Sequence, residues 1–328
     1  MTTTRSARWS RKATTLSIFV ALTGCADRLS PLPPHPAAAV QPVSGDDLSP
    51  DPDPVKQYLR ARCALDGRDT VTTWSGQLFA AVPGEAPRRL FDVVGMNVAR
   101  CGSDGSDGWF TSREVMLYLD PATHAPVDRW KNPWTGEEVA VVHVANSPVQ
   151  SRLPAARVPR WERAGDEARF RIDVPVAYPQ PLAPGGHYQA IEMFVLDAPA
   201  AEVTARARPT VSRLRLSWHR VGPWLPWMKM GDRPGTLVYS ATGARVDGYA
   251  ALPAALRAVI DERLPRFRAA PPCLVEGPSE TSFSYFARHR AAFERGERFP
   301  IAEEERPERC AAPPPATSAG APPRTTGR

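Results

Sequence analysis

Several motifs that mark common enzyme chemistries are missing from this sequence. It has no G-x-S-x-G turn for a serine nucleophile, no Walker loop for nucleotide phosphates and no G-x-G-x-x-G turn for a dinucleotide. The histidines show neither H-x-H nor H-E-x-x-H spacing, and the cysteine spacings match no zinc motif. The sequence therefore indicates no particular reaction, and it leaves both catalysis and cofactors unassigned.

The sequence also has little of the basic character that nucleic-acid binding requires. The whole chain carries a net charge of +6, but residues 1–24 hold four basic and no acidic side chains, so the remainder carries only +2. No run rich in Lys and Arg with interleaved aromatic residues occurs elsewhere. We therefore expect no nucleic-acid partner.

The apolar run near the N-terminus, residues 13–22, is too short to span a membrane as a mature helix. It follows a basic segment and ends in Leu22-Thr23-Gly24-Cys25, which resembles a bacterial lipobox. The pattern predicts a lipoprotein signal peptide over residues 1–24 and a lipid anchor on Cys25; an ordinary secretory signal is the alternative. Ala26 stands where Asp would favour inner-membrane retention, so we expect anchoring to the periplasmic side of the outer membrane.

The rest of the chain divides by composition into three parts. Residues 25–53 are rich in proline without an apolar period, which predicts a tether. Residues 54–310 are expected to form a single β-rich domain with C-terminal helices. Residues 311–328 are rich in Pro, Ala and Thr and are predicted to be disordered.

Helical periodicity is almost missing between Trp74 and Ala241, where period-two runs dominate. About nine or ten strands without intervening helices predict a mainly β fold, an antiparallel meander closed or strongly curved into a barrel of about eight to ten strands. Helices are expected after Asp53-Pro54 and over residues 252–264 and 283–295. A polar loop is expected over residues 102–108, and Asn146-Ser147-Pro148 is expected to end one strand. The main predicted strands are residues 74–82, 89–100, 112–119, 138–145, 168–175, 187–196, 211–218 and 236–241.

Two Trp-rich segments carry a family resemblance. They are R-W-K-N-P-W-T-G-E-E-V-A-V-V-H-V-A-N-S-P-V at residues 129–149 and S-W-H-R-V-G-P-W-L-P-W-M-K-M-G-D-R-P-G at residues 217–235. Both resemble the motifs of an uncharacterised bacterial family, domain of unknown function 1838, over about residues 74–283. The family has no established activity, so the resemblance implies a shared fold and no catalytic residues.

Besides Cys25, the chain has four cysteines, which allow three pairings. An exported protein favours disulfides. We expect Cys63–Cys101 to tie the first helix to the sheet and Cys273–Cys310 to tie the C-terminal helices, with buried free thiols as the alternative.

The candidate ligand-binding residues come from three patterns. His143 and His187, with His219, lie in separate strands and would meet only if they faced one cavity, where Glu114 or Glu192 would complete a metal site. Hydrogen-bonded core or rim histidines are the simpler interpretation. Arg113-Glu114 opens an apolar strand, as a rim ion pair or an anchor for an anion. Trp224, Trp227 and Met228 lie on a Pro-interrupted loop that forms either a ligand mouth or a packed lid.

The strand count and the Trp/Met-rich loop favour binding or carriage of a small, partly apolar molecule in a barrel cavity. Two alternatives remain open: an enzyme with a His/Arg/carboxylate pocket, with or without assistance from a metal, and a structural lipoprotein that docks a partner. The enzyme requires His143, His187 and His219 to converge, and the docking protein requires an exposed apolar surface.

Overall fold

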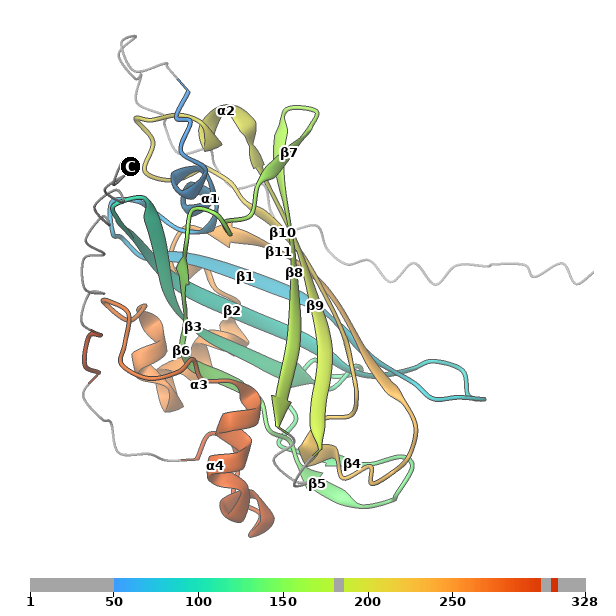
Figure 1. The fold of residues 1–328 in the computed structure, drawn as a ribbon. Coiled ribbons are helices and arrows are strands. Elements are labelled where there is room, and N and C mark those ends of the chain that lie inside the picture. Colours follow the sequence, from blue (N-terminus) through green and yellow to red (C-terminus); the bar gives the residue numbers. More distant parts are fainter. Residues whose placement is uncertain (1–49, 180–185, 302–307, 312–328) are drawn as a thin grey trace, which may run out of the picture. The chain divides into compact units, whose positions relative to one another are not determined.

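A nine-stranded antiparallel sheet dominates the described part of the protein (Figure 1). The computed structural model describes residues 50–179, 186–301 and 308–311. The predicted signal peptide, Cys25, nearly all of the predicted tether and residues 312–328 lie outside this part. The strands are β1 (Thr70–Ala81), β2 (Arg88–Asp104), β3 (Asp107–Leu119), β6 (Val144–Leu153), β7 (Trp161–Ala164), β8 (Glu167–Pro179), β9 (His187–Pro199), β10 (Arg215–Gly222) and β11 (Thr236–Val246).

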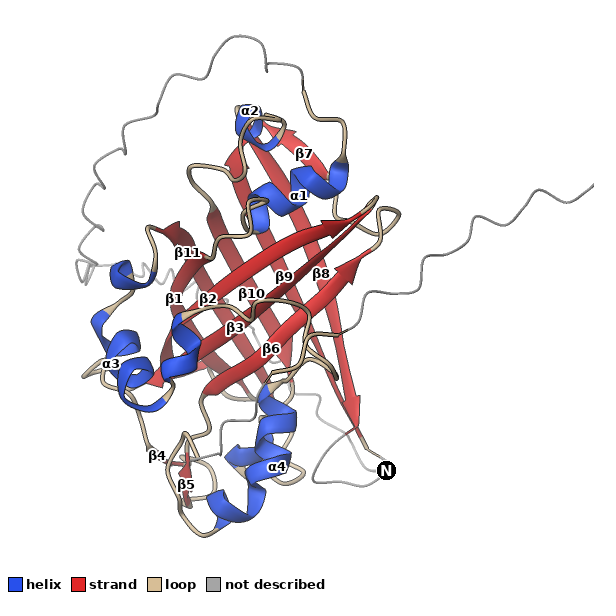
Figure 2. Ribbon diagram, turned by 90° about the vertical axis from the view of Figure 1, so that its left-hand side faces the viewer, coloured by secondary structure: helices blue, strands red, loops and turns tan. Residues whose placement is uncertain are grey.

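The chain connectivity forces this sheet to curl. The order is β6-β3-β2-β1-β11-β10-β9-β8-β7, so the consecutive strands β6 and β7 form opposite edges. In a flat sheet these edges would lie about 38 Å apart, at roughly 4.8 Å per strand. The connection over residues 154–160 reaches at most about 29 Å. The sheet accordingly forms a half-barrel (Figures 1 and 2), which confirms the predicted mainly β, strongly curved fold.

Two glycines permit the tight curvature where β1 meets β11. A Cβ atom at Gly76 would collide with the backbone oxygen of Ser240, and one at Gly243 would collide with that of Thr73. The two strands approach each other more closely here than a side chain would allow. The curvature of the half-barrel therefore requires small residues at these two positions.

The concave face can be identified from the contacts of one short helix. Helix α1 (Pro54–Arg62) is capped by Asp53, as predicted. Its Tyr58 packs edge-on against Phe170 of β8, and its Leu59 lies over Gly108 of β3. These strands lie near opposite edges of the sheet, so a single helix reaches both only from the concave side. The face that carries Phe170 and Gly108 is therefore the inner face.

The helices cover different parts of the half-barrel (Figure 2). Helix α3 (Ala254–Arg263) and the turn η4 (Pro265–Arg268) pack on the outer face of β2 and β3, where Leu256, Ile260 and Phe267 are fully buried. Helix α4 (Ser282–Glu294) packs beside β6. Both C-terminal helices were predicted. The smaller elements are β4 (Arg129–Lys131), β5 (Glu138–Ala140), α2 (Ala200–Val203), η2 (Pro226–Met228) and η3 (Tyr249–Ala251).

Four predicted boundaries are wrong. The strand predicted over residues 138–145 is interrupted at residues 141–143. Its first part, β5, pairs with β4 in a separate two-stranded sheet, and the following strand, β6, joins the large sheet. Strand β6 continues through Pro148, because an edge strand loses no ladder bond on its open side. The expected polar loop at 102–108 is a tight hairpin in which β2 and β3 pair to their ends at 104 and 107. Strand β10 begins at Arg215 rather than 211, since Val211 is bonded to α1 through the Arg60 carbonyl.

Both predicted disulfides are present. Cys63–Cys101 joins the end of α1 to β2 across a Cα–Cα distance of 6.0 Å. Cys273–Cys310 ties the C-terminal segment back across 5.7 Å. The first bridge is buried, whereas Cys310 is exposed.

Candidate functional site on the inner face

A buried cluster of one arginine and three tyrosines occupies the inner face. Arg220 of β10 donates a hydrogen bond to the Tyr188 hydroxyl over 2.8 Å, and its guanidinium lies 5.5 Å from the centre of the Tyr239 ring. The hydroxyls of Tyr118 and Tyr239 are 3.2 Å apart. Burial raises the pKa of Tyr118 and Tyr188 to about 12, with Arg220 opposing the shift. The phenols therefore stay protonated and act as hydrogen-bond donors and acceptors.

Two glutamates face this interior from strands on either side of the sheet. Glu192 of β9 lies 3.4 Å from Arg220 Nε, and Glu114 of β3 accepts a hydrogen bond of 3.0 Å from Asn97. Burial raises the pKa of both carboxyls; the Arg62 charge opposes the shift at Glu114, and Arg220 opposes it at Glu192. Strand register places both carboxyls on the inner face, and repulsion from Glu192 contributes to the raised pKa of Glu114.

Unpartnered polar atoms gather on the same face. Buried side-chain nitrogen and oxygen atoms usually have a hydrogen-bond partner. Among the described residues seven lack one, and register places six of these on the inner-face positions or at the end of α1 beside them. Five of the six are N–H donors. They are Arg62 Nε, Trp74 Nε1, Trp218 Nε1, Arg220 Nε and Arg245 Nε, and the sixth is the acceptor Asn146 Oδ1.

The two tryptophans in this set flank the middle of the half-barrel. The Trp74 indole lies over Gly95, where any side chain would collide with the ring. Trp218 packs between Phe194 and Tyr239, with ring centres 6.5 and 5.4 Å away. The Trp218 Nε1–H group lies close enough to Glu192 to stabilise its carboxylate. The geometry between them does not meet the criteria for a hydrogen bond. Both indole N–H groups thus lack a good acceptor.

Apolar side chains beside these groups remain partly open. Val174 of β8 faces inward in register with Glu192 and is 38% exposed. Ile172 and Phe194 on the same face are half-buried, as is Val144 of the opposite edge strand β6. The open side of the half-barrel therefore presents a mixed surface, apolar near the edges and rich in donors toward the middle.

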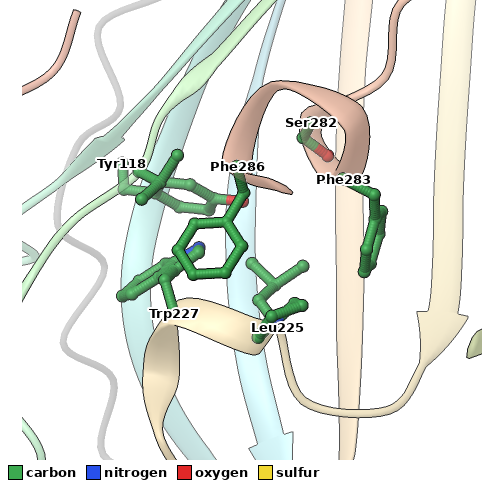
Figure 3. Close-up of a pocket in the computed structure, with 8 residues that line it drawn as sticks. Tyr118, Leu225, Trp227, Ser282, Phe283 and Phe286 are labelled. Atoms are coloured by element: carbon green, nitrogen blue, oxygen red, sulfur yellow. The ribbon is translucent and has the colours of Figure 1, made fainter. Parts of the chain in front are cut away.

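Aromatic side chains close one end of the half-barrel. A small pocket there is lined by residues of β3, η2 and α4 (Figure 3). The Trp227 ring lies 5.7 Å from that of Tyr118, and the Phe283 ring lies 4.1 Å from that of Tyr188. The pocket lies beside the tyrosine cluster through Tyr118 and has room for about one water, at 10 Å³.

The predicted Trp/Met loop forms a packed lid and not an open mouth. Trp224, Trp227 and Met228 are 9%, 5% and 0% exposed. Trp224 Nε1 donates to the Arg233 carbonyl over 2.9 Å, and Asn132 Nδ2 donates to the Met228 carbonyl over 2.9 Å. The exposed apolar surface that a docking protein would need is not formed by this loop.

Arg113 and Glu114 do not act as a pair, because consecutive strand residues point to opposite faces. Arg113 lies on the outer face, where it donates to Ser147 Oγ, to the Arg266 and Ala269 carbonyls and to both carboxylate oxygens of Glu308. Its guanidinium thus holds the C-terminal segment. Only Glu114 faces the interior.

The three histidines are not brought together. His143 is buried, and its Nδ1 accepts the Tyr118 backbone N–H over 3.0 Å. His187 and His219 are exposed on the outer face, since their neighbours Tyr188 and Arg220 point inward. The convergence that the enzyme alternative requires is therefore absent. No group of three His, Cys, Asp or Glu side chains placed to hold a metal occurs within the described ranges.

Sequence reasoning missed most of the inner-face residues. Trp74, Arg220, Tyr188 and Tyr239 were not singled out, although Trp218 and Arg220 stand two apart in a strand as inward-facing residues must. The sequence shows this alternation, but it does not show which side of the strand faces the interior of the half-barrel.

None of the helices in the described part is long and apolar enough to cross a membrane.

Comparisons with known proteins identify a family but no activity. A search of curated proteins found no match. Among solved structures, the chain is similar to the crystal structure of a LolA superfamily protein from Nitrosomonas europaea, with 8% identity, 61% of this chain and 95% of that chain covered, and a TM-score of 0.14. This likeness is too remote to bear on function. The model of the family described as "protein of unknown function (DUF1838)" matches residues 67–290, and the chain therefore belongs to this family.

Proposed function

We propose that the inner face of the half-barrel binds a small, partly apolar molecule whose polar end carries hydrogen-bond acceptors. The observation that carries this proposal is the set of five buried N–H donors without a hydrogen-bond partner on or beside one concave face. One of them, Arg220 Nε, faces the Glu192 carboxylate as an ion pair over 3.4 Å, and the other four have no such ion pair among the described residues. Leaving such a group unsatisfied costs about 1–3 kcal/mol. Water or a ligand therefore has to satisfy several of these donors, and carbonyl, hydroxyl or carboxylate oxygens fit them.

The apolar part of the ligand would lie against the open edge of the same face. Val174 is one of two large hydrophobic side chains that are exposed among the described residues. Ile172 and Phe194 beside it are half-buried. A molecule with an apolar body would cover these side chains while its oxygen atoms reach Trp74 and Trp218, and covering apolar area contributes roughly 25 cal/mol per Å².

Carriage of such a ligand would occur outside the cytoplasm, with the protein tethered through a lipid on Cys25 to the periplasmic side of the outer membrane. The lipobox-like Leu22-Thr23-Gly24-Cys25 supports this placement, as do the two disulfides, which persist in oxidising compartments. Residues 25–53 would serve as the tether, residues 54–310 as the ligand-binding domain, and residues 311–328 as a disordered tail.

The decisive experiment is native mass spectrometry of the chain from residue 25 onward with Cys25→Ser, purified without a histidine tag. We expect a retained organic adduct that dissociates under denaturing conditions. Trp74→Phe and Trp218→Phe remove one N–H each while preserving an aromatic ring, and each should reduce the retained fraction. Trp134→Phe is the control, because the Trp134 N–H is bonded to Glu85 near the surface.

The proposal fails if the folded protein retains nothing, or if both inner-face variants retain the adduct as well as Trp134→Phe does. A recovered molecule that the protein converts chemically would show catalysis by groups other than the three histidines and would replace the carrier proposal.

The anchor has a separate test. Expressed in a bacterium, the full chain should gain the mass of a diacylglycerol on Cys25 and fractionate with outer membranes. Cys25→Ser should abolish both properties. Release of unmodified protein into the periplasm by the natural sequence would instead support the ordinary secretory signal.

A further inference from the structure

A second cavity lies outside the inner face, between the β4–β5 sheet, the turn η2 and helix α4. Its volume is about 230 Å³. It shares Pro226, Trp227 and Phe286 with the small pocket of Figure 3, so these three residues lie between the cavities. An apolar cavity of about 150 Å³ is large enough to bind benzene. The cavity here therefore has room for a molecule of one or two fused rings.

Three aromatic side chains, Trp227, Phe286 and Phe293, line this cavity. Phe286 and Phe293 of α4 stack at an interplanar angle of 16° with ring centres 6.0 Å apart. Trp227 lies across from them and meets Trp130 edge-on at 6.1 Å. All except Trp130 line the cavity, together with Pro226 and Val139. Flat rings pack well against such surfaces, so a planar aromatic ligand suits them.

The rim carries five charged side chains, three positive and two negative, so its net charge is positive. Arg129 Nε lies 3.1 Å from Glu138, and Arg290 Nε lies 2.6 Å from Glu294. These two pairs are internally neutral. Lys229 also lines the cavity, and it forms no ion pair with any residue for which the structure gives a position. The rim thus has one uncompensated positive charge beside an aromatic wall.

The backbone holds Lys229 in an unusual conformation. Lys229 has φ 51° and ψ 46°, in the left-handed region, at the end of η2. Glycine adopts this conformation without strain, whereas lysine does not. Non-glycine residues in this region concentrate at functional sites. A lysine in this conformation, with its side chain at the rim of the cavity, fits a binding role for its charge.

We propose that this cavity binds a small aromatic carboxylate. The ring lies between Trp227 and the Phe286–Phe293 pair, and the carboxylate accepts a charge-assisted hydrogen bond from Lys229 Nζ. An aromatic cation is disfavoured by the excess positive charge. The site is independent of the inner face, whose unpartnered donors do not line it.

The test uses 2-naphthoate as the probe and its neutral amide, 2-naphthamide, as the comparison, with binding measured by calorimetry. Naphthoate should bind the natural chain, and Lys229→Gln should weaken it about tenfold while leaving naphthamide unchanged. Lys131→Gln is the matched control, since Lys131 of β4 is exposed nearby but does not line the cavity. Lys229→Gly should also lose naphthoate affinity while remaining folded, which separates the loss of charge from misfolding.

Proton NMR contacts between the naphthyl ring and the Trp227 indole would locate the probe in the cavity. Trp74→Phe and Trp218→Phe should leave naphthoate binding unchanged, which distinguishes this site from the inner face. The proposal is overturned if naphthoate does not bind the folded chain, if Lys229→Gln binds it as well as Lys131→Gln does, or if naphthamide loses as much affinity as naphthoate.

Discussion

Asn97 Nδ2 donates a hydrogen bond to Glu114 Oε1 over 3.0 Å, between paired positions of strands β2 and β3. The bond favours the charged carboxylate, and so does the Arg62 guanidinium, yet burial outweighs both and raises the pKa of Glu114. The carboxyl is therefore held on the inner face at a cost to the folded state. Such a cost is typical of groups that are kept for binding rather than for stability.

Glu114→Gln should stabilise the protein above neutral pH. Because the folded-state pKa is raised above 4.5, Glu114 favours folding below about pH 4.5 and loses this contribution as pH rises through the raised pKa. The glutamine keeps an acceptor for Asn97 without the charge. We expect a gain of about 1 kcal/mol at pH 8 in urea unfolding, shrinking toward pH 5. Glu137→Gln, at an exposed glutamate, should show no pH-dependent difference.

His143→Asn should remove a loss of stability in mild acid. Burial, reinforced by the Arg263 charge, lowers the pKa of His143 from 6.5 to about 3. The unfolded chain takes up a proton below pH 6.5 and the folded chain does not, so stability falls as pH drops from 6.5 toward 3. This site alone should cost about 1 kcal/mol between pH 7 and pH 5.5.

The measurement is the unfolding free energy of each variant across this pH range. The substituted asparagine would retain an acceptor for the Tyr118 N–H but not the titration, so the variant should be less stable at pH 7 with a flatter slope. His187→Asn, at an exposed position, should keep the natural slope. An unchanged slope in His143→Asn would show that His143 takes up a proton in the folded protein.

Arg113→Met should release the C-terminal segment. Arg113 is 7% exposed and its guanidinium binds Glu308 through two hydrogen bonds of 2.6 and 2.7 Å. Removing one partner of a buried pair costs about 3–5 kcal/mol. A double-mutant cycle with Glu308→Gln should give a coupling energy of about 1–3 kcal/mol. The exposed pair Arg171–Glu162 serves as the control, and its coupling should stay below about 1 kcal/mol.

The two disulfides should differ in their response to a reductant. Cys63 and Cys101 are 0% and 3% exposed, whereas Cys310 is exposed and Cys273 half-buried. Mild reduction under native conditions, followed by alkylation and mass mapping, should label Cys273 and Cys310 first. Replacing Cys63 and Cys101 together by alanine should cost roughly 3–4 kcal/mol in unfolding free energy. Equal labelling of all four thiols would contradict this order.

Local patterns sufficed for most of the architecture. Period-two runs located the strands, and capping and apolar spacing located α1, α3 and α4, because these signals depend on neighbours within a few residues. The sequence left three disulfide pairings open, and the structure confirms the expected one. The boundary errors arose where tertiary contacts override local preference: an edge strand tolerates Pro148, and residues 204–214 are held by Arg60 and Arg245.

Far less of the candidate site could be predicted from the sequence. Trp74, Glu114, Glu192 and Arg220 are separated by up to 146 positions in the chain, and nothing local indicates that their strands curl around one space. The sequence named Glu114 and Glu192 as additions to a site built on His143, His187 and His219. Strand register places His187 and His219 on the outer face.

Composition and short-range pattern were thus enough to predict a mainly β domain with two C-terminal helices, and two Trp-rich motifs indicated the DUF1838 family. Only the tertiary structure decided which face of each strand is concave, which polar atoms are left without partners, and that the Trp/Met loop is a lid. The reason is physical. The alternating side chains of a strand define its two faces, but they do not show which face is concave. A one-residue shift in register would move every side chain to the opposite face.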